Sequence, residues 1–314
     1  MTPPLDEKLV PLSHDALQAL DNLTGVHPGY RPVHAKGILL SGVFTPASDA
    51  ASLSRASHLH RPSTPVTVRL SDFAGIPNVP DNDPNASPRG IAIRFHLAEH
   101  VHTDIVAHSV DGFPCRTPEE FVEFLRAAGA SPPDAPKPTP IEKFLGAHPA
   151  ALRFIQAPKP IPVSFAKETF YAVNAYKFTN PAGVVQYGRY RIGPDGGGAY
   201  LSDAAAAAKP VNFLFDELKA RLADGPVKFH VVVQVAAPGD VVDDSTVMWP
   251  EDRPQVVFGT LELSTVMSNN DAEQRHLIFD PVPRVEGIDS SGDPLIEARA
   301  AIYLISGRRR RSAT

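Results

Sequence analysis

The sequence predicts an α+β fold, in which a large antiparallel β-barrel carries helices at its edges and leads into a C-terminal helix. Three observations support this. The 314 residues include 33 prolines, far above an average of about 5%, which favours short strands and turns over long helices. Eight strand-like runs are present, enough for a barrel. Helical patterns are fewer and peripheral.

The eight runs share β-branched or alternating side chains, and turn residues bound most of them. We expect strands at 37–44, 66–73, 90–97, 104–110, 184–192, 227–235, 256–266 and 276–282. The order of these strands in the barrel does not follow from the sequence pattern.

The helical patterns have apolar residues at helical spacing. In the second of them, Thr117 is an N-cap, Pro118 takes the first helical position and Glu120 completes a capping box. We expect helices at 14–22, 117–128, 141–156, 211–222 and 293–305. The whole chain, 1–314, is predicted to form a single domain, with a barrel core at about 30–285 and the C-terminal helix at about 293–306.

Charge and composition exclude several function classes. The formal net charge of -5 gives no reason to bind nucleic acid. The chain contains no apolar stretch of about 18 residues that would span a membrane, and its start does not resemble a secretory signal. Cys115 is the single cysteine, which excludes an internal disulfide and a thiolate zinc site. A cytoplasmic location is therefore expected.

The end of the chain, "EARAAIYLISGRRRRSAT", places Arg299 and Tyr303 four residues apart. On a helix they are neighbours on one face, so the guanidinium can lie against the phenol oxygen. A guanidinium is always protonated and favours the phenolate form of a neighbouring tyrosine. A phenolate is a hard oxygen donor that suits ferric iron, including haem iron. The alternative is a plain buried aromatic.

Six motifs in order resemble the landmarks of haem catalases, over nearly the whole chain. They are "RPVHAKG" (31–37), "TVRLSDFAG" (67–75), "SPRGIAIRFH" (87–96), "DIVAHSVDGFP" (104–114), "IFDPVPRVEGIDSSGD" (278–293) and "RAAIYLISGRR" (299–309). The chain is most similar to the short catalase-related haem peroxidases, which keep the minimal catalase core. This resemblance implies a catalase-like antiparallel eight-stranded β-barrel with peripheral helices and a C-terminal proximal helix, and haem b as the iron cofactor.

The resemblance also implies roles for individual residues. Tyr303 would be the axial ligand of the haem iron and Arg299 its partner. His34 would be the distal acid–base residue, with Ser71 hydrogen-bonded to its ring and Val33 leaning over the haem face.

Two further implications concern the rim of the haem and the peroxide. Arg31, Arg69 and Arg310 match positions that pair with haem propionates or line that edge of the macrocycle. Ser109 falls where catalases place a distal asparagine, and His108 lies beside it. Because that asparagine amide helps to hold peroxide, its absence argues against fast disproportionation of hydrogen peroxide.

The leading function is therefore a haem peroxidase that reduces hydrogen peroxide or organic hydroperoxides with a small organic electron donor. The main alternative is a true catalase. A fatty-acid hydroperoxide-transforming enzyme is a weaker one, because that branch has threonine where Val33 stands. A haem carrier or sensor, which binds haem but catalyses no reaction, is an alternative outside the enzymes. By analogy with tetrameric catalases, whose arms this chain lacks, we expect a homodimer.

Overall fold

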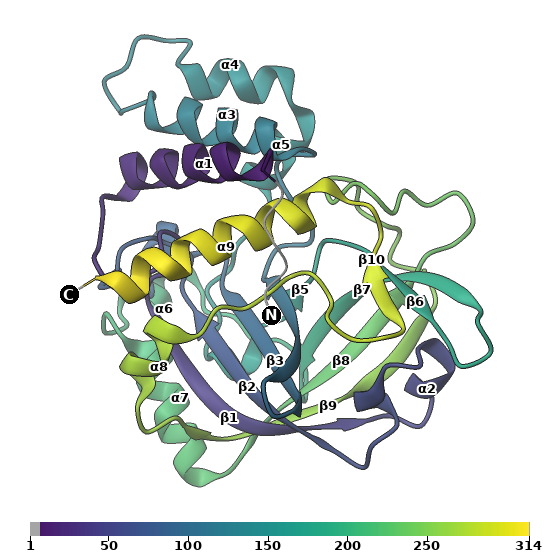
Figure 1. Cartoon of the computed structure of the whole chain (residues 1–314). Coiled ribbons are helices and arrows are strands. Elements are labelled where there is room, and N and C mark those ends of the chain that lie inside the picture. Colours follow the sequence, from purple (N-terminus) through teal and green to yellow (C-terminus); the bar gives the residue numbers. More distant parts are fainter. Residues whose placement is uncertain (1–6, 314) are drawn as a thin grey trace.

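Eight strands close into an antiparallel barrel in this computed structural model, which describes residues 7–313 (Figure 1). The predicted fold class is therefore confirmed. Around the ring, the strands are β1 (Gly37–Pro46), β2 (Thr64–Ser71), β3 (Gly90–Ala98), β4 (Val101–His108), β5 (Phe170–Tyr171), β7 (Val185–Pro194), β8 (Val227–Val235) and β9 (Gln255–Val266). β6 (Tyr176–Thr179) pairs with β7, and β10 (Ile288–Ser290) extends the sheet beyond β6.

Seven of the eight predicted runs form strands, but the prediction at 276–282 is wrong. This segment follows helix α8 (Asn270–His276) as irregular chain. Pro281 has no N–H for a ladder, and the N–H of Asp280 donates instead to the Asp104 carboxylate at 2.8 Å. The eighth barrel strand is β5, which pairs with β4 through one residue and with β7 through two.

The helices form the edges of the molecule. The predicted helix at 141–156 is two helices, because Pro149 interrupts the backbone ladder next to His148. The bounds are α1 (Leu9–Thr24), α2 (Ala50–Leu53), α3 (Pro118–Gly129), α4 (Pro140–Ala147), α5 (Pro149–Gln156), α6 (Asp203–Ala207), α7 (Phe213–Asp224) and α9 (Pro294–Ser312), with 3-10 turns η1 (Ser57–Leu59), η2 (Pro84–Ala86) and η3 (Phe165–Lys167).

Helix α9 lies across one end of the barrel, and α1, α3 and α4 form a further layer above it (Figure 1). Asp293 caps its N-terminus, and the helix continues to Ser312, beyond the predicted end near 306. Gly307 allows a close approach, because a Cβ there would lie 2.2 Å from Cδ1 of Ile278. Arg309 pairs with Asp21 of α1 through two bonds of 2.5 and 2.9 Å. These contacts fix the height of α9 above the barrel.

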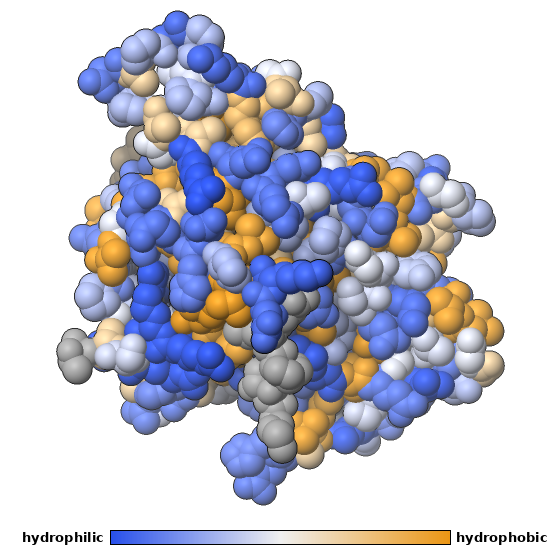
Figure 2. Space-filling model, turned by 45° about the horizontal axis from the view of Figure 1, so that its top comes forward, coloured by the Kyte–Doolittle hydropathy of each residue, from blue (hydrophilic) through white to orange (hydrophobic). Residues whose placement is uncertain are grey.

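The outer surface is mainly hydrophilic on the face that Figure 2 shows, with apolar patches between the upper helices and the barrel. Within residues 7–313, no helix combines the length and the apolar character that crossing a membrane requires.

The barrel interior is filled by aromatic side chains that meet edge to face. Phe44 and Phe95 lie 5.1 Å apart, and Phe258 lies 5.3 Å from Tyr190. His58 is buried among Phe44, Phe95 and Phe258, with ring centroids at 6.1, 5.0 and 5.7 Å. Burial, and then the charge of Arg61, lowers the pKa of His58 to about 4. The ring is therefore neutral in the folded protein.

This buried imidazole should make stability depend on pH. The pKa of His58 is about 6.5 in the unfolded chain and about 4 in the folded protein. Between these two pH values the unfolded chain is protonated at His58 and the folded protein is not. Stability from this residue is therefore lost as the pH falls through that window. We compare the free energy of unfolding of His58→Leu with that of the unsubstituted protein. As the pH falls from about 7.5 to about 5, this difference should change by about 2 kcal/mol in favour of His58→Leu. Urea unfolding at both values measures this.

The matched control is His14→Leu, which replaces an exposed histidine of α1. Substitution of an exposed side chain usually changes stability little, so we expect His14→Leu to unfold at nearly the same urea concentration as the unsubstituted protein. A difference between His58→Leu and the unsubstituted protein that did not change with pH would contradict this expectation for His58.

Candidate functional site

Helix α9 carries the predicted pair of Arg299 and Tyr303 on one face. Nε and Nη2 of Arg299 both lie 3.3 Å from Oη of Tyr303 and donate to it. Nη1 of Arg299 donates to Oδ1 of Asn174. Asn174 donates to Oδ2 of Asp293 at 2.8 Å, and the other oxygen of Asp293 accepts from the N–H of Leu295 at the start of α9. The guanidinium is thus held from both sides.

Arg299 stays positively charged although its side chain is buried. Burial alone would lower its pKa, but the facing phenol oxygens of Tyr303 and Tyr176, together with Asp293, raise the pKa above its usual value. A permanent cation therefore faces the Tyr303 oxygen.

His34 lies in the loop before β1, and its backbone is fixed on both sides. Its φ angle is 58°, in the left-handed region that few side chains adopt. Its N–H donates to the carbonyl of Phe73 at 2.7 Å, and its carbonyl accepts from Nη2 of Arg69 at 2.8 Å. Nδ1 of its ring lies 3.1 Å from Oγ of Ser71. These contacts hold the imidazole in one orientation.

The His34 ring is neutral. Burial lowers its pKa to about 3, and the positive charge of Arg69 and the neighbouring ring of His108 act in the same direction. The hydrogen bond that the structure gives this ring is made by Nδ1, which leaves Nε2 on the opposite side of the ring. With Nδ1 against the Ser71 hydroxyl, a neutral ring can offer the Nε2 lone pair to a substrate proton.

Three arginines gather around the end of α8, and one of them, Arg69, bonds to the carbonyl of His34. Arg31 donates to the carbonyls of Gln274 and Leu277, Arg69 donates to the side chain of Gln274, and Arg310 donates to the carbonyl of Leu277. Arg69 and Arg310 are only 3% and 4% exposed. Among the residues that the structure describes, no carboxylate forms a contact ion pair with any of the three, although Asp72 acts on Arg69 from a greater distance, so the cluster carries an excess of positive charge.

This cluster suits an anionic group. Burial, reinforced by Arg310, lowers the pKa of Arg69 to about 9, and burial lowers that of Arg310 to about 10. Both shifts express the cost of burying a cation without a contact ion pair. Nε of Arg310 is also buried and unpartnered. The two carboxylates of a haem would supply the missing charges, and Tyr303 would supply an oxygen ligand to its iron, so the residues fit this cofactor.

The remaining predicted residues lie around this centre. Val33 is half-buried and packs against the cluster of Ala19, Leu20 and Leu125. Oγ of Ser109 accepts a hydrogen bond from the N–H of Arg89 at 2.9 Å. His108 ends β4, and its buried Nε2 has no partner in the described part of the chain.

Three residues of the site were not predicted from the sequence: Asn174, Asp293 and Gln274. Asp293 had a visible signal, because an aspartate directly before a proline is a typical helix N-cap. Asn174 lies 125 positions from its partner Arg299, and Gln274 lies 205 from Arg69, so no local pattern could connect them.

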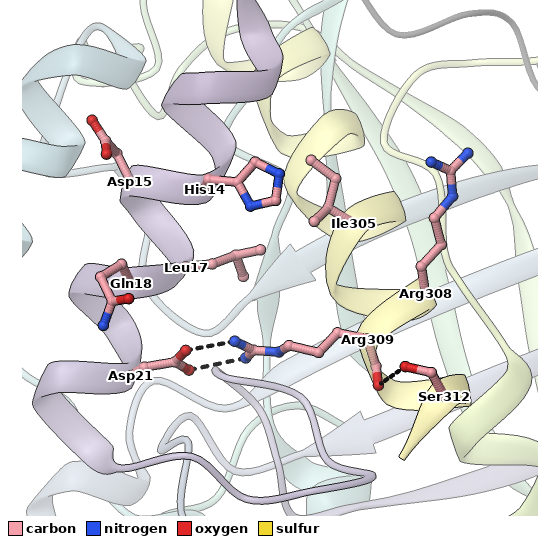
Figure 3. Close-up of a pocket in the computed structure, with 9 residues that line it drawn as sticks. All are labelled: His14, Asp15, Leu17, Gln18, Asp21, Ile305, Arg308, Arg309 and Ser312. Carbon is pink, nitrogen blue, oxygen red and sulfur yellow. Dashed lines mark hydrogen bonds and ion pairs between the residues drawn. The ribbon is translucent and has the colours of Figure 1, made fainter.

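A separate groove of about 690 Å³ lies between α1 and α9 (Figure 3). Figure 3 shows the ion pair of Asp21 and Arg309 across it, with Leu17 and Ile305 pointing into it. None of the predicted site residues lines this groove. We therefore place the candidate site at His34, Tyr303 and the arginine cluster.

Comparison with known proteins gives a consistent result. The family model described as Catalase matches residues 26–314. A catalase-related peroxidase from Mycolicibacterium paratuberculosis is 34% identical over 93% of this chain and 92% of its own length. A catalase-related peroxidase from Synechococcus elongatus is 31% identical, over 94% and 87%. The solved catalase A from Saccharomyces cerevisiae shares the fold with a TM-score of 0.78 at 22% identity, covering 90% of this chain and 61% of that one.

Proposed function

The chain belongs to the catalase family, and we propose on that basis that it is a haem-dependent peroxidase. It would reduce hydrogen peroxide or organic hydroperoxides with small organic electron donors. Relatives named catalase-related peroxidase, of nearly the same length, support an oxidoreductase that acts on peroxide.

The observation that carries the proposal is the cluster of Arg31, Arg69 and Arg310 without carboxylate partners, next to His34. Buried cations of this kind need anions, and we propose that haem b provides them through its two propionates. Tyr303, faced by Arg299, would hold the iron. Haem, when bound, supplies the redox chemistry of the reaction.

The proton chemistry belongs to His34. Its neutral ring would accept the proton of the hydroperoxide at Nε2 and return it to the departing oxygen, so that water or an alcohol leaves. Ser71 would keep Nδ1 engaged, so that the ring does not turn. The fixed backbone of His34 would hold the ring in place for both transfers.

A catalase is the second candidate, and the missing distal asparagine weighs against it. An absorption spectrum of the purified protein tests for haem. Oxygen release and oxidation of a phenolic donor, measured with the same hydrogen peroxide, then separate the two functions. Fast oxygen release without donor would favour the catalase, whereas donor oxidation with little oxygen supports the peroxidase.

Gly90 provides a specific test of how His34 is placed. A Cβ at Gly90 would lie 2.7 Å from Cε1 of His34 and 2.7 Å from Oγ of Ser71. Gly90→Ala should therefore displace the ring, slow the reaction with peroxide about 100-fold and leave haem content unchanged. Stopped-flow absorption measures the rate.

The control is Gly193→Ala on β7, where an added Cβ would meet nothing within 4 Å. It should react at the normal rate. If Gly90→Ala reacted as fast as this control, the placement of His34 would not depend on that contact.

The small organic donor, a cytoplasmic location and a homodimer stay predictions of the sequence. Dimer formation is checked by light scattering of the purified protein.

A further inference from the structure

We propose that His108 is a second distal residue, which donates a hydrogen bond from Nε2 to an oxygen atom of the peroxide. This inference rests on the proposed function and moves to His108 the role that the sequence predicted for Ser109.

The strand register places His108 beside His34. Ser71 of β2 lies opposite Gly90 of β3, and Gly90 lies opposite His108 of β4. Directly opposed residues in antiparallel strands point to the same face, with neighbouring Cα atoms about 5 Å apart. Ser71 and His108 therefore share a face, one on each side of Gly90.

The His34 ring fills the place between them. Because a Cβ on Gly90 would lie 2.7 Å from Cε1 and 2.8 Å from Nδ1 of His34, the imidazole occupies the space of the absent side chain. Ser71 contacts this ring on one side. His108 approaches from the other side, and the two imidazoles influence each other electrostatically.

The hydrogen bonds of His108 define which of its nitrogens carries the proton. Nδ1 faces the N–H of Val110 at 3.3 Å, and a backbone N–H can only donate. Nδ1 must therefore be an acceptor, and the proton of the neutral ring lies on Nε2. Nε2 is thus a buried N–H donor without an acceptor in residues 7–313. A buried N–H of this kind can donate a hydrogen bond to an oxygen atom of a bound ligand.

The surroundings keep this ring neutral and fixed. Burial, and then the positive charge of Arg299, lowers the pKa of His108 to about 3. Phe154 of α5 meets the ring edge to face at 6.2 Å. A fixed donor shielded from water stabilises developing negative charge well. When His34 takes the proton of the peroxide, the oxygen left behind gains negative charge, and the Nε2–H of His108 can donate a hydrogen bond to it.

Two substitutions test the donor. His108→Phe keeps an aromatic ring against Phe154 but removes the N–H, whereas His108→Asn keeps an N–H donor. His102→Phe, on the same strand, is the control. We expect His108→Phe to slow the peroxide reaction about 100-fold, and His108→Asn and His102→Phe to retain most of the rate.

A second readout does not depend on turnover. An N–H that points at carbon monoxide bound to the reduced, haem-loaded protein lowers the C–O stretching frequency. His108→Phe should raise this frequency, and the two other variants should leave it near the original value. His108→Leu repeats the measurement if His108→Phe binds little haem.

The outcomes separate the two proposals. A purified protein without a haem spectrum would overturn the proposed function itself. A haem protein that oxidises donors, but in which His108→Phe changes neither rate nor frequency, would overturn only the role of His108. A His108→Asn variant as slow as His108→Phe would exclude the donor role as well.

Discussion

Replacement of Tyr303 by phenylalanine should remove most of the haem from the protein. Tyr303 is the oxygen donor that faces the buried Arg299, and the substitution deletes this oxygen while keeping the ring. Loss of residues that only support a metal ligand weakens binding about 10- to 100-fold, so loss of the ligand itself should exceed roughly 100-fold. The ratio of haem absorbance to protein concentration measures the effect.

Tyr190→Phe is the matched control for this experiment. Tyr190 is buried in the barrel, 3% exposed, and its substitution also removes one phenol oxygen without changing ring packing. We expect it to bind haem normally. A normal haem stoichiometry in Tyr303→Phe would refute the assignment of the ligand, whatever the activity of that variant.

The predictable parts of the fold are those with a local physical cause. The alternating run at 227–235 became β8 with the same bounds, because alternation directly reports a strand with one buried face. The pair of Arg299 and Tyr303 followed from helical spacing alone. By contrast, β5 is only two residues long, too short for any periodicity, and it forms because β4 and β7 are already in place on each side.

The segment 276–282 shows the opposite error. Its apolar residues indicated a strand, yet they pack beneath α9 and its backbone groups bond to side chains such as Asp104. Local sequence cannot distinguish these two uses of an apolar run. The same limit applies near the end of β4, where the sequence alone does not indicate which side chains share a face with the site. Only the register with Gly90 indicates that His108 shares a face with Ser71.

Replacement of His34 should have the second large effect, on the reaction and not on the cofactor. Neither Tyr303 nor the arginine side chains depend on the imidazole, so His34→Ala should keep its haem. A positioned acid–base group contributes about 100- to 10,000-fold to a rate, and we expect a loss in that range for the reaction with hydrogen peroxide. Stopped-flow absorption at a fixed peroxide concentration measures it.

Two further variants separate the chemistry of His34 from its placement. The backbone at His34 has a φ of 58°, which glycine adopts without strain, so His34→Gly removes the ring with the least disturbance of the loop. It should be as slow as His34→Ala. Ser71→Ala leaves the imidazole in place and removes only the contact at Nδ1, so its loss should be smaller. If neither His34 variant changed the reaction with peroxide relative to the unsubstituted protein, the acid–base role of His34 would be refuted; in a haem carrier or sensor, which needs no proton acceptor beside its cofactor, no such change is expected.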